Sequence, residues 1–470
     1  MLSRDLLQTA QRRALTVGTL VQLQLRNALL NPSKREQGAW LAERFQALGP
    51  TYVKAGQFVS SRQDVFGEEF SEPFGALRDR VRPIDRADVE AVLSRCIDAS
   101  AFRSIDYDPI ASASIGQVHA AVLSNGARVV IKIKRPGIDA VIKEDIEFLT
   151  AVIDVITRVN GASAENRAQA MGFLRELETH LVRESDFRLE AKNAERFRAM
   201  YADDPAVRIP ATLPTLCNAS VIVMEYVPCS GMDTFAPDGA ALRRDMANRV
   251  MDTFVSQLVY KGLVHGDPHS GNLGFDDKGR LVLYDFGSVI DITTEERQRM
   301  KEIIYQLLVG NNRAVSDTLK KLGVRVLDEG AMEAYIDLYR DYMRTIDVST
   351  IATGAAAAGA AQGPDTPVPV QLTDTFVRLI RVYGMLEGTC KRISADFNYF
   401  DLLDNYIDEL FFDEEFISYK IAEDVRSLFA PARPPAPAPP PAPPPAPGRA
   451  AIGAKEVAIL LLLAHALLPP

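Results

Sequence analysis

The sequence is poor in the residues that build covalent or metal-held frameworks. It has four cysteines that form no Cys-x-x-Cys pair: Cys96, Cys217, Cys229 and Cys390. This scatter argues against a structural zinc site and against a secreted disulfide fold, and it favours a reducing compartment. The five histidines form no ligand-spaced cluster, so histidine-bound metal is not expected.

Net positive charge is also lacking. The chain carries −9, which excludes a generic nucleic-acid-binding protein, so no nucleic acid is expected among its partners. The charge is uneven: residues 1–35 hold six basic side chains and one acidic one, residues 36–430 hold 44 and 60, and residues 431–470 hold three and one. Basic ends on an acidic body are attracted to anionic phospholipid, although they also simply aid solubility.

Uninterrupted apolar runs are short at both ends. Arg12, Arg13 and Arg26 interrupt every such run in the N-terminal segment, so it is not a secretory signal. A basic amphipathic helix and a mitochondrial transit peptide both fit its pattern. The run Val457–Leu468 is shorter than the ~20 residues that span a bilayer. A docked or membrane-dipping tail and a frayed end both remain open.

Proline is concentrated in one place. Eleven of the 28 prolines lie between Pro431 and Pro447, a run that favours an extended spacer and ends the folded body near Ala430. A second low-complexity patch, Gly354–Gly363, is predicted to be a flexible loop between helices. The composition of the whole chain, with 47% apolar and 24% charged residues, is that of an ordinary globular protein.

Strands are predicted early and helices late. The sequence predicts a β-hairpin of Ile105–His119 and Val122–Lys134, turned at Asn125-Gly126, and a strand within Pro210–Val227. From residue 240 the chain is predicted to be mostly helical, with a strand–loop–strand at 264–290. Earlier helices are predicted at four places: 36–65, 85–100, 138–159 and 167–201. This order indicates an α+β protein with a small sheet-containing lobe followed by a larger helical lobe.

Two motifs point to phosphoryl-transfer chemistry. His265–Asn272 reads HGDPHSGN, in which Asp267 and Asn272 have the D-x4-N spacing of a kinase catalytic loop. Asp285–Gly287 reads DFG, the start of a magnesium-binding loop. Each motif alone is weak, because DFG occurs by chance and an Asp–Asn pair is common in turns. Their order and separation together favour a kinase-like fold.

The predicted hairpin supplies the phosphate-binding lysine. Val129–Lys132 resembles the strand that carries this lysine in kinases, whereas Lys134 is interpreted as a solvent-facing residue of the same strand. The glutamate that pairs with Lys132 is expected on the following helix, where the candidates are Glu184, Asp186 and Glu190.

The phosphate-covering loop departs from the glycine-rich pattern. It reads Ala111-Ser112-Ala113-Ser114-Ile115-Gly116, in which only Gly116 remains of the usual glycines. Glycines let backbone N–H groups approach phosphate closely, so this loop is expected to alter the nucleotide pose and to disfavour ordinary protein phosphorylation.

Together these residues resemble the UbiB/ADCK family of atypical kinase-like ATPases, the AarF type of ubiquinone biosynthesis. The family's KxGQ motif matches Lys54, Gly56 and Gln57, and its ExD motif matches Glu184 and Asp186. The alanine-rich loop PIASASIGQVHAA, the hinge strand VIVMEYV, the catalytic loop and DFG complete the match. Two departures are Ser112, where alanine is commoner, and HGDPHSGN, where a proline commonly precedes the Gly-Asn.

The resemblance implies a protein-kinase-like two-lobe fold with a helical KxGQ extension over the active site. Six segments are expected: a basic amphipathic segment 1–35, the extension 36–105, the N-lobe 106–227, a helical C-lobe 228–430, a Pro/Ala linker 431–450 and a short apolar tail 451–470.

The resemblance also implies residue roles. Lys132 would contact phosphates and pair with Glu190, Asp267 would be the catalytic aspartate, and Asn272 and Asp285 would hold magnesium. Lys54 would meet the ExD acids and restrict access to protein substrates. Nucleotide contacts are expected from Lys132 and two segments: Ala111, Ser112, Ala113, Ser114, Ile115 and Gly116 in the loop, and Met224, Glu225 and Val227 at the hinge.

The implied activity is Mg²⁺-dependent ATP binding and hydrolysis, with ATP/ADP and Mg²⁺ as cofactors, supporting isoprenoid-quinone biosynthesis or lipid handling at a membrane. Expected partners are anionic membrane lipid and quinone-biosynthesis proteins or lipid intermediates, and a homodimer is left open. The expected location is cytoplasmic and peripheral to a bacterial inner membrane, with a mitochondrial location as the alternative.

Two other functions remain open. HGD-x4-N is also similar to small-molecule phosphotransferases of the aminoglycoside and choline kinase type. The altered phosphate loop is compatible with a low-turnover nucleotide-binding scaffold. Within the catalytic loop, His265 is interpreted as a structural histidine rather than a catalytic base; His269 and His119 are interpreted as structural or loop-positioning.

Overall fold

The computed structural model describes most of the chain, and its residues form two units. The described residues are 2–60, 62, 66–77, 83–159, 163–232, 239–308, 310–345, 370–397 and 413–429. Unit 1 comprises Met1–Cys229 and Asp276–Ser288, and unit 2 comprises Ser230–Phe275 and Val289–Pro470. The loop predicted at Gly354–Gly363, the linker at 431–450 and the tail at 451–470 lie outside the described residues.

Unit 1 begins with a helical segment. Its elements are α1 (Leu2–Leu30), α2 (Lys34–Leu48), α3 (Pro50–Ser60), the short α5 (Glu68–Ser71) and the 3₁₀ helix η1 (Glu72–Ala76). Ser33 and Glu36 form a reciprocal capping box that starts α2, and Gly49, at φ +114°, ends it. The helix predicted at 36–65 is therefore two helices broken at Gly49, where a left-handed backbone favours glycine.

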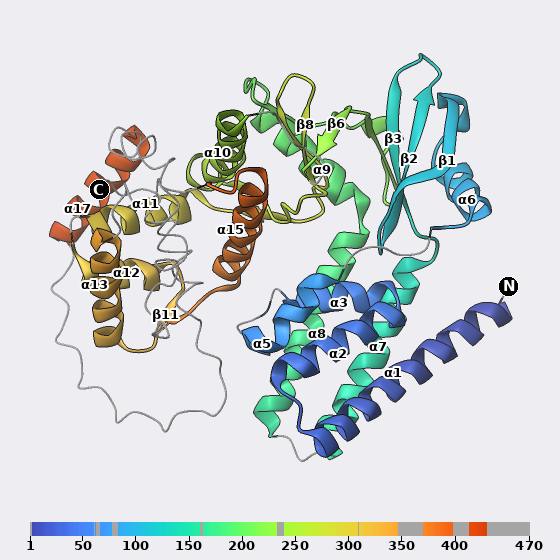
Figure 1. The fold of residues 1–470 in the computed structure, drawn as a ribbon, viewed down its shortest axis with the longest axis horizontal. Coiled ribbons are helices and arrows are strands. Elements are labelled where there is room, and N and C mark those ends of the chain that lie inside the picture. The colour runs from blue at the N-terminus through green and yellow to red at the C-terminus, as the bar shows by residue number, and fades with distance from the viewer. Residues whose placement is uncertain are drawn as a thin grey trace. The chain divides into compact units, whose positions relative to one another are not determined.

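The sheet of unit 1 is antiparallel, with the order β1-β2-β3-β5. Its strands are β1 (Phe102–Ser112), β2 (Gly116–Leu123), β3 (Arg128–Lys134) and β5 (Val221–Glu225), preceded by α6 (Arg86–Cys96) and the 3₁₀ turn η2 (Ala99–Ala101). Figure 1 shows α6 lying beside this sheet. The core that they share is apolar and includes Val89, Val92, Ile131, Ile133 and Val223.

The turn predicted at Asn125-Gly126 is correct, whereas the bounds of both predicted strands are wrong, because Val122–Lys134 contains the end of β2, this turn and β3. Gly126, at φ +88°, turns the chain between β2 and β3, and Asn125 Oδ1 accepts from Ala127 N–H at 2.9 Å. The strand predicted at Ile105–His119 is divided between β1 and β2, because the chain reverses at residues 113–115, where Ala113 N–H donates to Gly116 O at 2.8 Å. The phosphate-covering segment is this turn.

The long helices of unit 1 follow the sheet in the chain. They are α7 (Ile138–Val159), α8 (Ala164–Ser185) and α9 (Phe187–Met200). The single helix predicted at 167–201 is thus wrong, because Asp186 leaves the helical conformation and caps α9, its carboxylate accepting from Arg188 N–H at 3.1 Å. Short elements complete the unit: β4 (Val207–Arg208), η3 (Pro214–Leu216) and β9 (Leu281–Leu283), which pairs in parallel with β4.

Unit 2 is mainly helical. Its helices are α10 (Ala240–Ser256), α11 (Thr294–Leu308), α12 (Asn312–Lys321), α13 (Glu329–Thr345), α15 (Asp374–Ile393) and α17 (Glu414–Phe429), with a π turn, η4 (Gln257–Lys261), after α10. Helices α10 and α15 pack together through fully buried side chains that include Phe254 and Tyr383, and Tyr383 Oη donates to Phe254 O at 2.9 Å.

The strands of unit 2 are short. They are β7 (Leu263–His265), β10 (Val289–Asp291), β11 (Arg325–Val326) and β12 (Val370–Gln371), paired antiparallel as β7 with β10 and β11 with β12. Strands β6 (Cys229–Gly231) and β8 (Leu273–Asp276) contain points at which the chain passes from one unit to the other. Among the described residues, no helix is both long and apolar enough to cross a membrane.

Candidate functional site

Strand β3 presents Lys132 to two carboxylates in unit 1. The Lys132 Nζ atom lies 2.7 and 2.8 Å from the two Glu190 oxygens and 3.1 Å from Asp285 Oδ2. Glu190 comes from α9 and Asp285 from the DFG segment. The structure therefore brings together three residues that are far apart in the sequence, since Glu190 and Asp285 are 58 and 153 positions from Lys132. Glu190 is the glutamate expected to pair with Lys132.

Burial and charge shift the pKa values of these groups in different directions. Burial lowers the pKa of Lys132, but the carboxylates of Asp285 and Glu190 outweigh it and raise the pKa above its usual value. Burial raises the pKa of Glu190 to about 7, although Lys132 opposes the change. The pKa of Asp285 is well below its usual range, because the Lys132 ammonium outweighs desolvation. Asp285 therefore stays ionised and can offer oxygen ligands.

The DFG segment holds Asp285 in an unusual backbone conformation. Asp285 has a φ of +54°, and its Oδ1 accepts from Gly287 N–H at 3.1 Å. Phe286 is buried against Phe197 of α9, with ring centroids 4.9 Å apart, and Asn193 Nδ2 donates to Phe286 O at 3.0 Å. Since non-glycine residues rarely adopt this conformation, these contacts fix the direction of the Asp285 carboxylate.

The KxGQ lysine meets one of the two ExD acids. Lys54 Nζ of α3 lies 3.2 Å from Glu184 Oε2 of α8, and His180 Nε2 lies 3.4 Å from Glu184 Oε1. Burial raises the pKa of Glu184, but Lys54 and His180 outweigh it, so the carboxylate stays ionised. Asp186 instead binds Arg188 at 2.8 Å while it caps α9.

Gly56 and Gln57 have packing roles in the structure. A Cβ atom on Gly56 would lie 2.2 Å from Leu77 Cδ1 and 3.0 Å from the buried ring of Phe74, so α3 approaches η1 only because this residue lacks a side chain. Gln57 Nε2 donates a long hydrogen bond, 3.5 Å, to Leu77 O.

The alanine-rich loop is fastened by an arginine that the sequence did not single out. Arg135 donates from Nε to Ala113 O at 3.0 Å and from its terminal nitrogen to Ser112 Oγ at 2.9 Å, and its backbone N–H donates to Ile115 O at 2.8 Å. The Ser114 hydroxyl is buried and has no hydrogen-bond partner among the described residues. Ala111 lies in β1, where it pairs with Val118 of β2.

Gly116 lets β2 approach its neighbours closely. A Cβ atom there would lie 2.9 Å from Ile133 O and 3.0 Å from the Phe187 ring. The close backbone contact within the sheet therefore requires glycine at this position. This requirement is separate from the close approach to phosphate for which kinases use glycine.

The hinge residues lie in and directly after β5, the edge strand of the unit 1 sheet. Met224 and Glu225 pair with Val130 and Val129 of β3, and Glu225 N–H donates to Ala211 O at 2.8 Å. Val227 O accepts from the Tyr284 hydroxyl at 3.3 Å. Tyr284, directly before Asp285, thus connects the hinge to the DFG segment, and no sequence signal indicated it.

Lys134 is not the exposed residue that the sequence predicted. It is 8% exposed, and its Nζ donates to Asp139 Oδ2 at 2.7 Å and to Ser185 O, the last carbonyl of α8, at 2.9 Å. The alternation of the strand predicted an outward side chain, but α7 and α8 cover this end of β3.

The catalytic-loop motif in unit 2 is held by a hydrogen bond within the loop and by an arginine of α15. Asn272 Nδ2 donates to Asp267 O at 3.0 Å, which leaves the amide oxygen as the free ligand atom of this side chain. Arg381 of α15 donates to Gly266 O at 3.0 Å and lies 3.9 Å from Asp267 Oδ1. Arg381 belongs to a distant helix, so no local pattern could have indicated it.

The histidines of this loop have structural partners. His265 is fully buried, and its Nδ1 accepts from Asp267 N–H at 3.3 Å. His269 Nδ1 accepts from Gly271 N–H at 3.0 Å. In unit 1, His119 is buried between Gln117 Nε2 at 2.8 Å and Asp106 O at 2.9 Å. These contacts hold the rings in place and agree with their structural interpretation.

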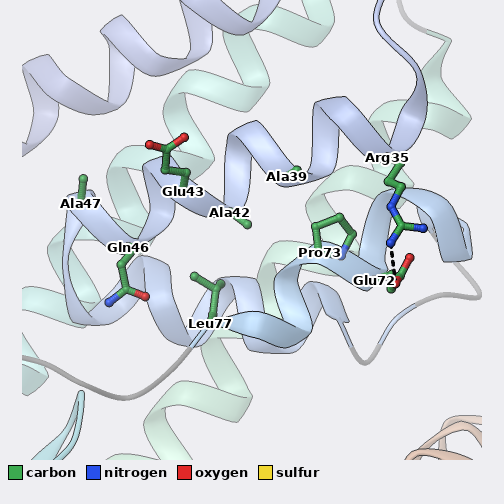
Figure 2. Close-up of a pocket in the computed structure, with 9 residues that line it drawn as sticks. All are labelled: Arg35, Ala39, Ala42, Glu43, Gln46, Ala47, Glu72, Pro73 and Leu77. Atoms are coloured by element: carbon green, nitrogen blue, oxygen red, sulfur yellow. Dashed lines mark hydrogen bonds and ion pairs between the residues drawn. The ribbon is translucent and has the colours of Figure 1, made fainter.

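A separate groove of about 730 Å³ lies between α2 and η1. Figure 2 shows the Arg35–Glu72 ion pair, 2.9 Å, at one end and small side chains along the floor. None of the residues predicted for the site lines it; the lining is Arg35, Ala39, Ala42, Glu43, Gln46, Ala47, Glu72, Pro73 and Leu77.

Comparison with known protein families supports this reading of the fold. A family model described as the ABC1 atypical kinase-like domain matches residues 76–319. The chain is 30% identical over 386 residues to an Arabidopsis thaliana protein named Activity of bc1 complex kinase 7, chloroplastic, covering 80% of this chain and 55% of that protein. It is 29% identical to an uncharacterized Synechocystis protein, covering 76% and 65%. The chain thus spans between about half and two thirds of these relatives' length.

A solved structure shares the fold. It is the complex of Rv3197 with erythromycin from Mycobacterium tuberculosis, with a TM-score of 0.51 and 24% identity, covering 66% of this chain and 80% of that one. Together with the family model, the small sheet of unit 1 and the helical unit 2, this likeness confirms an α+β, protein-kinase-like two-lobe fold.

Proposed function

The chain belongs to the ABC1 atypical kinase-like family, and from this premise we propose that it is an Mg²⁺-dependent ATPase. The observation that carries the proposal is the contact of Lys132 with Glu190 and Asp285, at 2.7 and 3.1 Å. This set combines a cation suited to phosphate with a carboxylate suited to magnesium. It retains the charged groups that phosphoryl chemistry requires, although the covering loop has lost its glycines.

The oxygen atoms present fit magnesium bound together with nucleotide. Magnesium takes one or two protein oxygen ligands and fills its remaining positions with phosphate and water. The Asp285 carboxylate is 44% exposed and ionised, so unit 1 offers one ligand of this kind. Among the described residues, no group of three or more His, Cys, Asp or Glu side chains could hold a metal alone. A nucleotide-assisted site is therefore the form proposed.

Each remaining residue has a proposed task. Lys132 binds the phosphates, and Glu190 holds its ammonium in place. In unit 1, Asp285 would hold the magnesium, which would supply charge neutralisation at the phosphates when bound. The motif resemblance alone assigns the orientation of the attacking oxygen to Asp267 and a second magnesium contact to Asn272. The loop of residues 111–116, fastened by Arg135, covers the nucleotide, and Met224–Val227 holds its base.

The Lys54–Glu184 pair favours hydrolysis over transfer to a large acceptor. Its two side chains are 15% and 16% exposed, and they join α3 to the end of α8, directly before the capping residue of the helix that carries Glu190. On the motif resemblance, we propose that a helix fastened there restricts the access of protein substrates to the nucleotide. We assign the physiological role to isoprenoid-quinone biosynthesis or lipid handling at a membrane, on the motif resemblance alone.

The test is phosphate release from ATP with and without Mg²⁺. Asp285→Asn is expected to lower Mg²⁺-dependent release by about 100-fold or more, because the substitution removes the ionised metal ligand. Asp98→Asn, which changes an exposed aspartate of the same unit, is the matched control. An Asp285→Asn protein that hydrolyses ATP as fast as the wild type would refute the assignment. If the γ-phosphate of ATP is instead transferred to a hydroxyl group of a metabolite, the protein is a small-molecule phosphotransferase rather than an ATPase.

A further inference from the structure

Arg135 makes three hydrogen bonds to the turn at which β1 passes into β2. Its Nε donates to Ala113 O at 3.0 Å, and a terminal nitrogen donates to Ser112 Oγ at 2.9 Å. Its backbone N–H donates to Ile115 O at 2.8 Å. A single residue directly after β3 thus fastens the loop that is expected to cover a nucleotide. We call residues 112–116 the clamped turn.

One of these bonds sets the direction of a peptide group in the clamped turn. In a trans peptide the C=O and N–H groups point in opposite directions. Since Arg135 Nε binds Ala113 O, the N–H group of the same peptide, that of Ser114, is directed away from the arginine. Kinase loops bind phosphate through such backbone N–H groups, which glycine lets approach closely. In this chain an arginine fixes the orientation that glycines do not supply.

The positive charge of Arg135 is suited to an anion. Its two described side-chain bonds go to neutral oxygen atoms, a carbonyl and a hydroxyl. Burial lowers the pKa of the Arg135 guanidinium, whereas a dominant carboxylate neighbour would raise that pKa. The desolvation of the charge therefore outweighs any attraction from carboxylates. An anion placed against the clamped turn would offset this cost, and the polyphosphate of a nucleotide is such an anion.

The clamped turn also contains a buried hydroxyl. The Ser114 side chain is 0% exposed, and its Oγ has no hydrogen-bond partner among the described residues. Because a buried polar atom without a partner destabilises a fold, the side chains of the turn do not by themselves favour its conformation. The bonds from Arg135 oppose this cost. Ser112 adds one of them, which the commoner alanine at this position could not accept.

We propose that Arg135 is a positioning residue that fits the clamped turn to the phosphates of a nucleotide, by orienting the Ser114 N–H group and by adding positive charge beside it. This inference rests on the proposed binding of ATP and states which part of the nucleotide the loop recognises. Loss of Arg135 should weaken binding more as the number of phosphates rises from one in AMP to three in ATP. An arginine that merely stabilises the fold would affect both nucleotides alike.

Calorimetric titration of the full chain with ATP, ADP and AMP, in excess Mg²⁺, tests this role. Arg135→Gln is expected to weaken ATP binding by about 10-fold and AMP binding by less than about 2-fold, with ADP between them. Arg135→Lys keeps the charge but loses the planar fork, so it should recover part of the loss for ATP. Ser112→Ala removes one bond and keeps the charge, and it should weaken ATP binding by less than about 3-fold.

The matched control is Arg103→Gln, which removes an exposed arginine at the opposite end of β1 and should leave all three affinities unchanged. Thermal unfolding checks that each variant is folded. If Arg135→Gln is unfolded, Arg135→Lys is held to the same comparison, with ATP binding weakened more than AMP binding.

Two results would overturn the role of Arg135 alone: equal weakening of all three nucleotides, or ATP binding that matches the wild type. A wild type that binds ATP without releasing phosphate would contradict only the ATPase activity. A wild type that binds none of the three nucleotides would overturn both proposals.

Discussion

Replacing Glu190 by glutamine is expected to make the folded protein progressively more stable, relative to wild type, as the pH rises. Glu190 is 6% exposed, and burial raises its pKa to about 7 from an ordinary value of 4.5. The folded protein therefore holds this proton more tightly than the unfolded chain does. The resulting stabilisation is complete below pH 4.5 and is lost as the pH rises through 7.

The magnitude follows from the two pKa values. A carboxyl group that shifts between them changes the free energy of unfolding by about 3 kcal/mol between pH 4.5 and pH 8. Glutamine keeps the size of the side chain and has no proton to lose. The difference in unfolding free energy, Glu190→Gln minus wild type, should therefore rise by about 3 kcal/mol over this pH range.

Urea unfolding without nucleotide or divalent cation measures this difference. The single tryptophan, Trp40, lies in α2 of unit 1, so its fluorescence reports on the unit that contains Glu190. Glu72→Gln, which removes a half-exposed carboxylate paired with Arg35, is the control and should change stability by less than about 1 kcal/mol at both pH values. A difference for Glu190→Gln that is constant with pH, or that falls as pH rises, would refute the reasoning.

Three further predictions concern packing and buried charge. Gly56→Ala should lower the free energy of unfolding by about 1–3 kcal/mol, because its Cβ would overlap Leu77, and Gly172→Ala, which meets nothing within 4 Å, should not lower it in the same urea titration. Lys54→Met should lower stability by about 1–3 kcal/mol at pH 7, because it removes the cation that outweighs the burial of the Glu184 carboxylate; an unchanged free energy of unfolding would contradict this. Lys301→Met should lower the melting temperature of unit 2 in calorimetry, at a cost of about 3–5 kcal/mol, because it leaves the Asp413 carboxylate unpaired beside α11. An unchanged melting temperature would show that this ion pair is dispensable.

The parts of the fold that the sequence predicted depend on local chemistry. Asn125-Gly126 turns the chain between β2 and β3 because its preferred backbone conformation suits a tight reversal, and this preference needs no distant partner. The contact of Lys132 with Glu190 was expected from the motif pattern rather than from any spacing. The roles of these residues in binding nucleotide stay predictions until they are measured.

The parts that the sequence did not predict depend on one local cap that interrupts a helical pattern and on contacts between distant residues. The break between α8 and α9 occurs because the Asp186 carboxylate accepts from Arg188 N–H and so caps α9. The residues around it favour helix, so the sequence predicted one continuous helix there. Lys134 is buried because α7 and α8 cover its end of β3. The side of α1 that faces α7 is set in part by the bond from Arg12 to Asp145, 133 residues away, which no local pattern indicated.

Phosphate release from ATP by the wild type and by Lys132→Met tests the central claim most directly. Lys132 is the cation that joins Glu190 and Asp285, so its loss should lower Mg²⁺-dependent release by about 100-fold or more. The control Lys143→Met removes an exposed lysine of α7, 74% exposed, and should leave the rate unchanged. Release by the wild type that depends on Mg²⁺ and disappears only in Lys132→Met is the predicted result. Equal release by Lys132→Met and wild type would contradict the account.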